Sequence, residues 1–246
     1  TARRSAKART PGTVTASMRA TVSSNGGVGA LWSGRRCAQS GAAAGEARCL
    51  MLLSRRKVRL ETERLTLRPP VHGDFHGWAA LRLQSQDYLV PWEPVWAPDH
   101  LSRKAFTNRV YWAQRAVSSG SALPLFLIRR SDQTLVGAIT LDNIRRGPAQ
   151  AGTLGYWTGQ PFARRGYMAE AIGAVVHHAF GKLDLSRIEA ACLPENVASR
   201  GLLERSGFKY EGVAQSYLQI NGRWRTHVLY ASLRHDRRGK TLVGQA

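Results

Sequence analysis

Apolar residues follow regular spacings from about residue 64 to residue 233, and few such patterns precede them. Alternation of apolar and polar positions predicts strands, and apolar residues at every third or fourth position predict helices. We expect strands at Arg64–Pro69, Leu125–Arg130, Thr134–Asn143, Ala151–Thr158, Arg187–Leu193, Phe208–Val213, Ser216–Ile220 and Arg223–Leu233. We expect helices at Asp74–Arg82, Ser102–Ser118, Met168–Phe180 and Asn196–Ser206.

The helix at Met168–Phe180 has the clearest pattern. Its expected buried stripe is Met168, Ile172, Val175, Val176 and Ala179, and Gly181 is expected to end it. In the helix at Ser102–Ser118, Ser102 is the expected cap, and the expected stripe is Phe106, Val110 and Ala113.

Two short segments predict connections. Leu89–Pro98 holds three prolines and two tryptophans, so it is expected to be a rigid loop. Asn221-Gly222 lies between two apolar runs and is a strong signal for a tight hairpin. The order of elements predicts one mixed α/β domain over residues 58–236, with a central mixed, mostly antiparallel sheet flanked by helices.

Composition limits the class of protein. The chain has 246 residues, of which 43% are hydrophobic, and no apolar run is long enough to span a membrane. We therefore expect a soluble protein. Cys37, Cys49 and Cys192 are too few and too widely spaced for a disulfide framework or a zinc site, which favours a reducing compartment, the cytoplasm. The net charge of +20 favours acidic partners such as nucleic acid or a polyphosphate cofactor.

Residues 1–57 differ from the rest of the chain. They hold eleven Lys and Arg residues against the single acid Glu46, and few large apolar residues. Such a segment is expected to be disordered and dispensable. Three readings remain open: sequence upstream of a true start at Met51, a basic arm, or a targeting segment. Residues 237–246 are expected to be a short tail.

A phosphate-binding loop is the main chemical feature. The strand at Ala151–Thr158 leads through Ala163, Arg164, Arg165 and Gly166 into the clearest helix. Free N–H groups at a helix N-terminus bind anions, glycine lets a phosphate approach the backbone, and arginine adds charge. Alone, the segment could equally be a basic solvated turn.

The rest of the chain favours the phosphate-binding interpretation of this loop, because the sequence resembles the GNAT superfamily of N-acetyltransferases. The stretches that carry the resemblance are VRLETERLTLRP, LVPWEP, GTLGYWTG, ARRGYMAEA, LPENVASRGLLERSGFKYEG and YLQINGRWRTHVLYA. They cover most of 58–233 and are most similar to the ribosomal-protein-alanine N-acetyltransferases. Ala163 and Met168 depart from the family's loop pattern, whereas Gly166 keeps it.

The resemblance implies acetyl-CoA as co-substrate, no metal, and direct attack by an amine on the thioester. It places the cofactor on the strand end and the loop, at Tyr156, Trp157, Thr158, Ala163, Arg164, Arg165, Gly166, Tyr167 and Met168. A free backbone N–H of the strand would polarise the thioester carbonyl.

Two further residues follow from the Pro-x-Asn-x-x-Ser pattern of the family. Asn196 would hold the pantetheine arm, although Asn at this position also suits a helix N-cap. Ser199 would bind the cofactor and protonate the leaving thiolate, since the tyrosine that many relatives carry seven residues after the Asn is here Leu203. An ordinary first-turn serine is the alternative.

The general base is less well marked. Some relatives carry an acid before the tyrosine that matches Tyr217, but this chain has Ser216, so Glu93 in the Pro-Trp-Glu-Pro loop is the remaining candidate. An N-terminal α-amine has a pKa near ~7.7–8 against ~10.4 for lysine, so it needs less help from a base. We therefore expect an N-terminal amine as acceptor. Cys192 is expected to be a buried apolar residue without a catalytic role.

The predicted function is acetyl transfer to a protein N-terminus, such as the N-terminal alanine of a ribosomal protein, with ribosome or rRNA contact through the basic surface and no membrane partner. A GNAT enzyme for a small amine, such as an antibiotic or an amino acid, is one alternative. A ribosome-associated assembly or binding protein is another.

Overall fold

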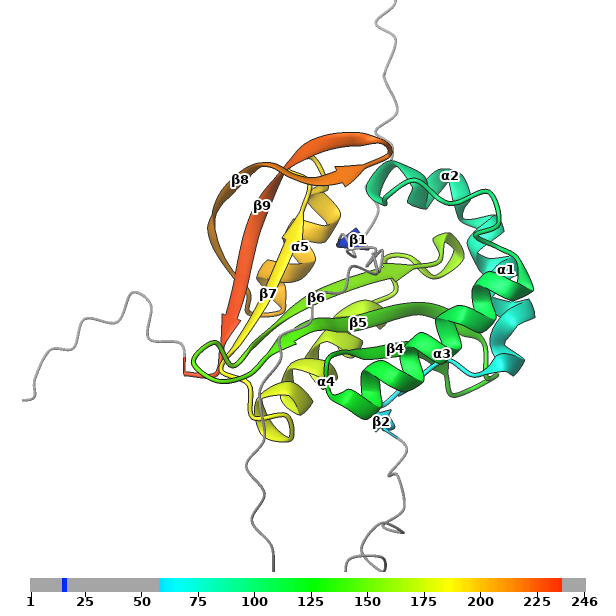
Figure 1. Ribbon diagram of the computed structural model, residues 1–246, viewed down its shortest axis with the longest axis horizontal. Coiled ribbons are helices and arrows are strands. Elements are labelled where there is room, and N and C mark those ends of the chain that lie inside the picture. Colours follow the sequence, from blue (N-terminus) through cyan, green and yellow to red (C-terminus); the bar gives the residue numbers. More distant parts are fainter. Residues whose placement is uncertain (1–14, 17–57, 236–246) are drawn as a thin grey trace, which may run out of the picture. The chain divides into compact units, whose positions relative to one another are not determined.

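The computed structural model describes residues 15–16 and 58–235 (Figure 1). The expectations of disorder over residues 1–57, and of a tail over 237–246, lie outside these residues, apart from the short strand at 15–16. Within the described part the chain has the mixed α/β fold that the sequence predicts.

The strands form one mixed sheet. Along the sheet the order is β2 (Leu60–Glu61), β3 (Leu65–Arg68), β4 (Leu123–Arg129), β5 (Leu135–Arg145), β6 (Ala151–Thr158), β7 (Arg187–Cys192), β9 (Arg223–Leu233) and β8 (Lys209–Ile220). Neighbouring strands run antiparallel except for β6 and β7, which are parallel. The two-residue strand β1 (Thr15–Ala16) pairs antiparallel with β6.

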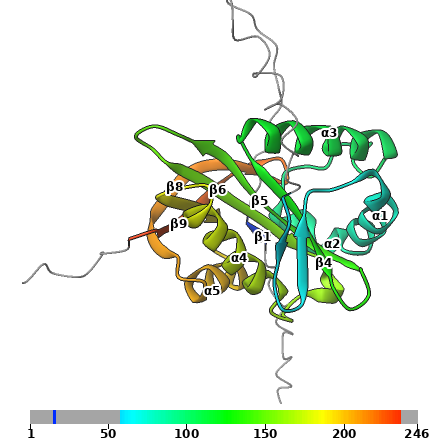
Figure 2. The same ribbon diagram turned by 90° about the horizontal axis from the view of Figure 1, so that it is seen from below.

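The helices cover the two faces of this sheet. They are α1 (Phe75–Gln84), α2 (Gln86–Leu89), α3 (Arg103–Ser119), α4 (Tyr167–Gly181) and α5 (Val197–Arg205). Figure 2 shows α1 and α3 on one face and α4 and α5 on the other. Parallel strands need a crossover connection, and α4 supplies it between β6 and β7.

The expected helix stripes are buried. Phe106, Val110 and Ala113 of α3 face the core, and Ser102 caps the helix by accepting a hydrogen bond from the Ala105 N–H at 3.1 Å. On α4 the whole expected stripe is buried except Val176, which is half-buried. α4 ends at Gly181, as expected, but Gly181 is the last helical residue and not a left-handed cap, and the right-handed Lys182 follows it.

Three connecting segments can be compared with the prediction. The sequence predicts separate strands at Phe208–Val213 and Ser216–Ile220, but the structure has the single strand β8. The expected break corresponds to a shift in the pairing register with β9 between Ala214 and Leu218. Asn221 and Gly222 both have positive φ, as the expected tight hairpin requires. The proline-rich loop is mainly irregular, with a 3-10 turn at Val90–Trp92.

Candidate active site

The site begins where β6 and β7 separate. Their register runs from Ala151↔Arg187 to Leu154↔Ala190 and then stops, although β6 continues to Thr158. From Gly155 onward this edge of β6 meets no other strand of the described chain than β1, which touches Tyr156 and Trp157. A strand edge offers a row of N–H and C=O groups, and on this edge of β6 those of Tyr156 and Trp157 pair with β1, which shows that an extended segment fits here.

The loop after β6 is shaped to bind an anion. Arg164 has φ 62° and Gly166 has φ 82°, both in the left-handed region. Gly166 is the N-cap residue of α4, and no side chain caps the helix. The first N–H groups of α4 therefore point outward without a helical partner, and the helix dipole adds positive potential there.

A pocket of about 490 Å³ opens at this helix end. Six of the residues that the sequence assigns to the cofactor line it: Thr158, Ala163, Arg164, Gly166, Tyr167 and Met168. Its size is within the range of small-molecule sites. Of the remaining assigned residues, Arg165 has an exposed side chain that does not line the pocket.

Sequence reasoning missed the opposite wall of the pocket. That wall belongs to α5, which contributes Val197, Ala198, Leu202 and Arg205. Ala198, Leu202 and Arg205 recur at helical spacing after the Asn196 cap, which is the signal that could have located this wall. Val197 is 71% exposed, and an exposed apolar residue beside a pocket suits contact with the apolar part of a ligand.

Behind the pocket lies a buried pair of hydroxyl groups. The Oη atom of Tyr156 is 2.9 Å from Oγ of Ser199, and neither residue is exposed. Burial raises the pKa of the Tyr156 phenol well above its usual range, so this group keeps its proton. Tyr156 is thus fixed as a neutral partner that orients the Ser199 hydroxyl.

Asn196 is buried and caps α5. Its Oδ1 accepts the Ser199 N–H at 3.0 Å, so the capping role of this residue is confirmed. Its binding to a pantetheine arm stays a prediction.

Cys192 lies at the end of β7 beside these groups. Its side chain is buried, and burial raises the pKa of the thiol to about 11. The protonated thiol is a poor nucleophile, which agrees with the expectation that Cys192 has no covalent role.

Glu93 lies in a different setting from the one expected. Its carboxylate accepts two hydrogen bonds from the buried Arg82, at 2.9 and 2.5 Å, and one from the Trp96 indole at 2.9 Å. The Arg82 guanidinium in turn lies over the Trp96 and Trp157 rings. A carboxylate engaged at both oxygens must break a hydrogen bond before it takes a proton, so this geometry favours a structural role for Glu93 over a general base.

The Glu93 loop also meets the far end of the sheet. The Asn221 N–H at the β8–β9 turn donates to the Glu93 carbonyl at 2.9 Å. The loop and this turn are therefore neighbours beyond the ends of β6 and β7, and Figure 1 shows α2 beside the same turn.

The described residues, 15–16 and 58–235, hold no cluster of His, Cys, Asp or Glu that could bind a metal ion. None of their helices is long and apolar enough to cross a membrane.

A parallel pair of strands that separates beside a helix with an anion-binding N-terminus defines the acetyltransferase fold that the sequence suggested. The chain belongs to the GNAT acetyltransferase family, whose profile, described as "Acetyltransferase (GNAT) domain", matches residues 64–209. The protein is an acetyl-CoA-dependent N-acetyltransferase.

Within this family, the chain is similar to several ribosomal-protein acetyltransferases. The chain is 35% identical over 175 residues to the ribosomal protein uS5-alanine N-acetyltransferase of Escherichia coli, covering 71% of this chain and 90% of that protein. The structure of a ribosomal-protein-S5-alanine acetyltransferase from Vibrio fischeri matches with a TM-score of 0.68 and 27% identity, covering 73% of this chain and 98% of the other. Mycobacterium smegmatis RimJ, solved in complex with CoA-disulfide, matches with a TM-score of 0.68 and 29% identity over 73% of this chain and 88% of its own.

Proposed function

We propose that this protein acetylates the N-terminal α-amine of a protein, and that its acceptor is the N-terminal alanine of a ribosomal protein. The similarity to the Escherichia coli uS5-alanine enzyme carries this proposal, because it extends over nine-tenths of that protein. A second relative, the ribosomal-protein-serine acetyltransferase of Escherichia coli, also modifies a ribosomal protein by its name and is 26% identical over 132 residues.

Acetyl-CoA supplies the activated acetyl group and lies with its pyrophosphate on residues 164–168. The left-handed loop and the uncapped α4 provide the N–H groups for this anion, and Arg164 adds charge. The pantetheine arm follows the edge of β6 that β7 leaves, in the place where β1 pairs with Tyr156 and Trp157, toward Asn196. There, a backbone N–H of β6 polarises the thioester carbonyl as the amine attacks.

Ser199 protonates the leaving thiolate. Its hydroxyl is buried within hydrogen-bond distance of the Tyr156 hydroxyl, which limits the directions in which the Ser199 proton can point. A thiol has a pKa near ~8.5, so the thiolate is already a fair leaving group and the donor contributes modestly.

The setting of Glu93 supports an α-amine as the acceptor. With both oxygens of Glu93 bound to Arg82 and Trp96, deprotonation depends largely on the acidity of the amine itself. The ~2.5 pKa units between an α-amine and a lysine make the free α-amine about 300 times more abundant at neutral pH. An N-terminal amine therefore reacts where a lysine side chain does not.

The charge of the chain fits a substrate on or near the ribosome. With 36 basic and 16 acidic residues, the protein is attracted to rRNA, which would concentrate it beside ribosomal proteins in the cytoplasm.

The test is acetylation of a ribosomal protein mixture with isotopically labelled acetyl-CoA, followed by mass spectrometry of the peptides. We expect label at one N-terminal alanine, and none on lysine side chains. The matched control is the same mixture with its N-termini blocked by prior acetylation, which should take up no label. Label on lysines, or transfer only to free amino acids or other small amines, would contradict the proposal.

A further inference from the structure

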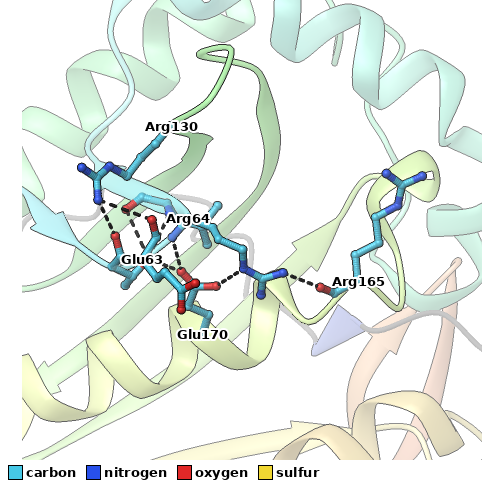
Figure 3. A network of polar contacts seen from close by, with 7 residues as sticks. Glu63, Arg64, Arg130, Arg165 and Glu170 are labelled. Atoms are coloured by element: carbon cyan, nitrogen blue, oxygen red, sulfur yellow. Dashed lines mark hydrogen bonds and ion pairs between the residues drawn. The ribbon is translucent and has the colours of Figure 1, made fainter.

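The Thr62-Glu63-Arg64 segment before β3 is part of the family resemblance, yet it contributes no residue to the pocket wall. Its role becomes visible in its contacts with α4 (Figure 3). The Arg64 backbone N–H and side-chain Nε donate to the two carboxylate oxygens of Glu170, at 2.8 and 2.7 Å. The Thr62 hydroxyl donates to the same carboxylate. Glu170 lies in the first turn of α4, so these bonds fix the start of β3 to the helix that begins at the anion site.

Arg64 then reaches past Glu170 to the loop itself. Its Nη1 donates to the Arg165 carbonyl at 3.0 Å, and its guanidinium lies over the Tyr167 ring, 4.7 Å from the centroid. A Cβ atom on Gly166 would be 3.2 Å from Nη2 of Arg64. One guanidinium therefore contacts Arg165 and Tyr167 and lies beside Gly166 between them, whereas the Arg165 side chain extends away from it in Figure 3.

The bond to the Arg165 carbonyl sets the direction of the next N–H group. In a trans peptide the C=O of Arg165 and the N–H of Gly166 point in opposite directions, and the plane between them is rigid. Because Arg64 holds the carbonyl on its own side, the Gly166 N–H is turned away from Arg64, and Gly166 lines the pocket.

The negative charge of Glu170 also calls for Arg64 at this position. Burial raises the pKa of Glu170, but the hydrogen bonds from Thr62 and Arg64 outweigh burial and hold it below its usual range, so the group is a carboxylate at neutral pH. A carboxylate in the first turn of α4 repels a pyrophosphate at the same helix end. The charge of Arg64, 2.7 Å away, offsets that repulsion.

We propose that Arg64 is a positioning residue for acetyl-CoA, which orients the Arg165–Gly166 peptide toward the pyrophosphate and neutralises Glu170 beside it. This inference rests on the proposed place of the pyrophosphate, and it does not depend on which acceptor the enzyme uses. Arg64 acts through the loop and does not need to touch the cofactor.

The experiment compares two acetyl donors, acetyl-CoA and S-acetylpantetheine, whose thioester arm ends before the pyrophosphate. With an acceptor that the wild-type enzyme acetylates, Arg64→Met should raise the KM for acetyl-CoA about tenfold at nearly constant kcat. With S-acetylpantetheine its kcat/KM should stay within twofold of wild type. CoA binding by calorimetry, which needs no acceptor, should weaken by the same factor, or ~1.4 kcal/mol.

Arg130→Met is the matched control. Arg130 is part of the network of Figure 3 and donates to the Thr62 and Glu63 carbonyls, and within the described part of the chain none of its side-chain hydrogen bonds reaches the loop. It should leave the KM for acetyl-CoA within about twofold. Arg64→Lys keeps the charge but lacks the planar fork that reaches Glu170 and the carbonyl together, so its KM should lie between those of wild type and Arg64→Met.

Two results would overturn the inference: an equal loss with both donors, which indicates a general effect on folding, or no loss with acetyl-CoA. The placement of the pyrophosphate is tested separately by substitution of Gly166. If Gly166 variants lose CoA binding and Arg64→Met does not, this inference fails alone. If neither does, the proposed cofactor placement fails with it.

Discussion

Gly166 offers the most direct test of the cofactor site. It has φ 82°, a conformation that costs an L-residue about 1–2 kcal/mol, and a branched side chain more. A loop that relaxes from this strain must be restored to the left-handed form before its N–H groups face phosphate. Gly166→Ala should therefore weaken CoA binding by about 5–30-fold, and Gly166→Val by at least tenfold, or ~1.4 kcal/mol.

The assay is titration calorimetry with CoA, beside thermal unfolding of each variant. Gly173→Ala is the matched control, because Gly173 lies in the same helix without positive φ, and a Cβ atom there meets no atom within 4 Å. That change should leave affinity unaltered and stabilise the fold by about 0.5–1 kcal/mol through helix propensity. Wild-type affinity in Gly166→Val would show that the loop does not bind the cofactor.

Four further outcomes are expected. Ser199→Ala should lower kcat about 10–100-fold with little change in CoA affinity, and full activity would assign the proton to solvent. Glu93→Gln leaves the buried Arg82 without its counter-charge, so stability should fall by about 3–5 kcal/mol, with a rate loss that is equal at pH 6 and pH 9. A larger loss at pH 6 would instead identify Glu93 as the base. Cys192→Ala should retain near-normal turnover, and a folded, CoA-binding but inactive variant would refute direct transfer. Burial beside Arg82 lowers the pKa of His100 to about 3, so the unfolded chain takes up this proton first. The contribution of His100 is complete above pH ~6.5 and is lost as pH falls toward 3, by up to ~1.4 kcal/mol per pH unit. Denaturant titrations of wild type and His100→Asn should show a shallower pH dependence in the variant, and identical slopes would contradict this account.

Most of the fold could be predicted because local patterns specify it. The strand at Ala151–Thr158 was predicted to the residue, and the apolar stripe of α4 was predicted with one exception. The end of α4 at Gly181 was also predicted, although the glycine does not adopt the left-handed conformation that makes glycine a common helix stop. The break expected near Ser216 shows the limit of such reasoning, because the long partner strand β9 keeps β8 continuous through register shifts.

The site was predictable only in part, for a related reason. The loop at Arg164 and Gly166 follows from a local motif, whereas α5 joins the pocket through tertiary packing. Glu93 was expected to be a base or an exposed turn residue because its partner Arg82 lies eleven residues away on another element. Arg64 and Glu170 are 106 residues apart, and their pairing becomes evident only when β3 and α4 lie side by side.

The early end of the β6–β7 register also bears on the mechanics of the sheet. Strands β2 to β6 and strands β7 to β9 are joined across that seam by four residue pairs, from Ala151↔Arg187 to Leu154↔Ala190. If acetyl-CoA binds along β6 as proposed, it would also link the two halves of the sheet where β6 and β7 no longer pair. Its departure as CoA would then leave these halves joined by the four residue pairs alone, apart from the contact of β1 with β6.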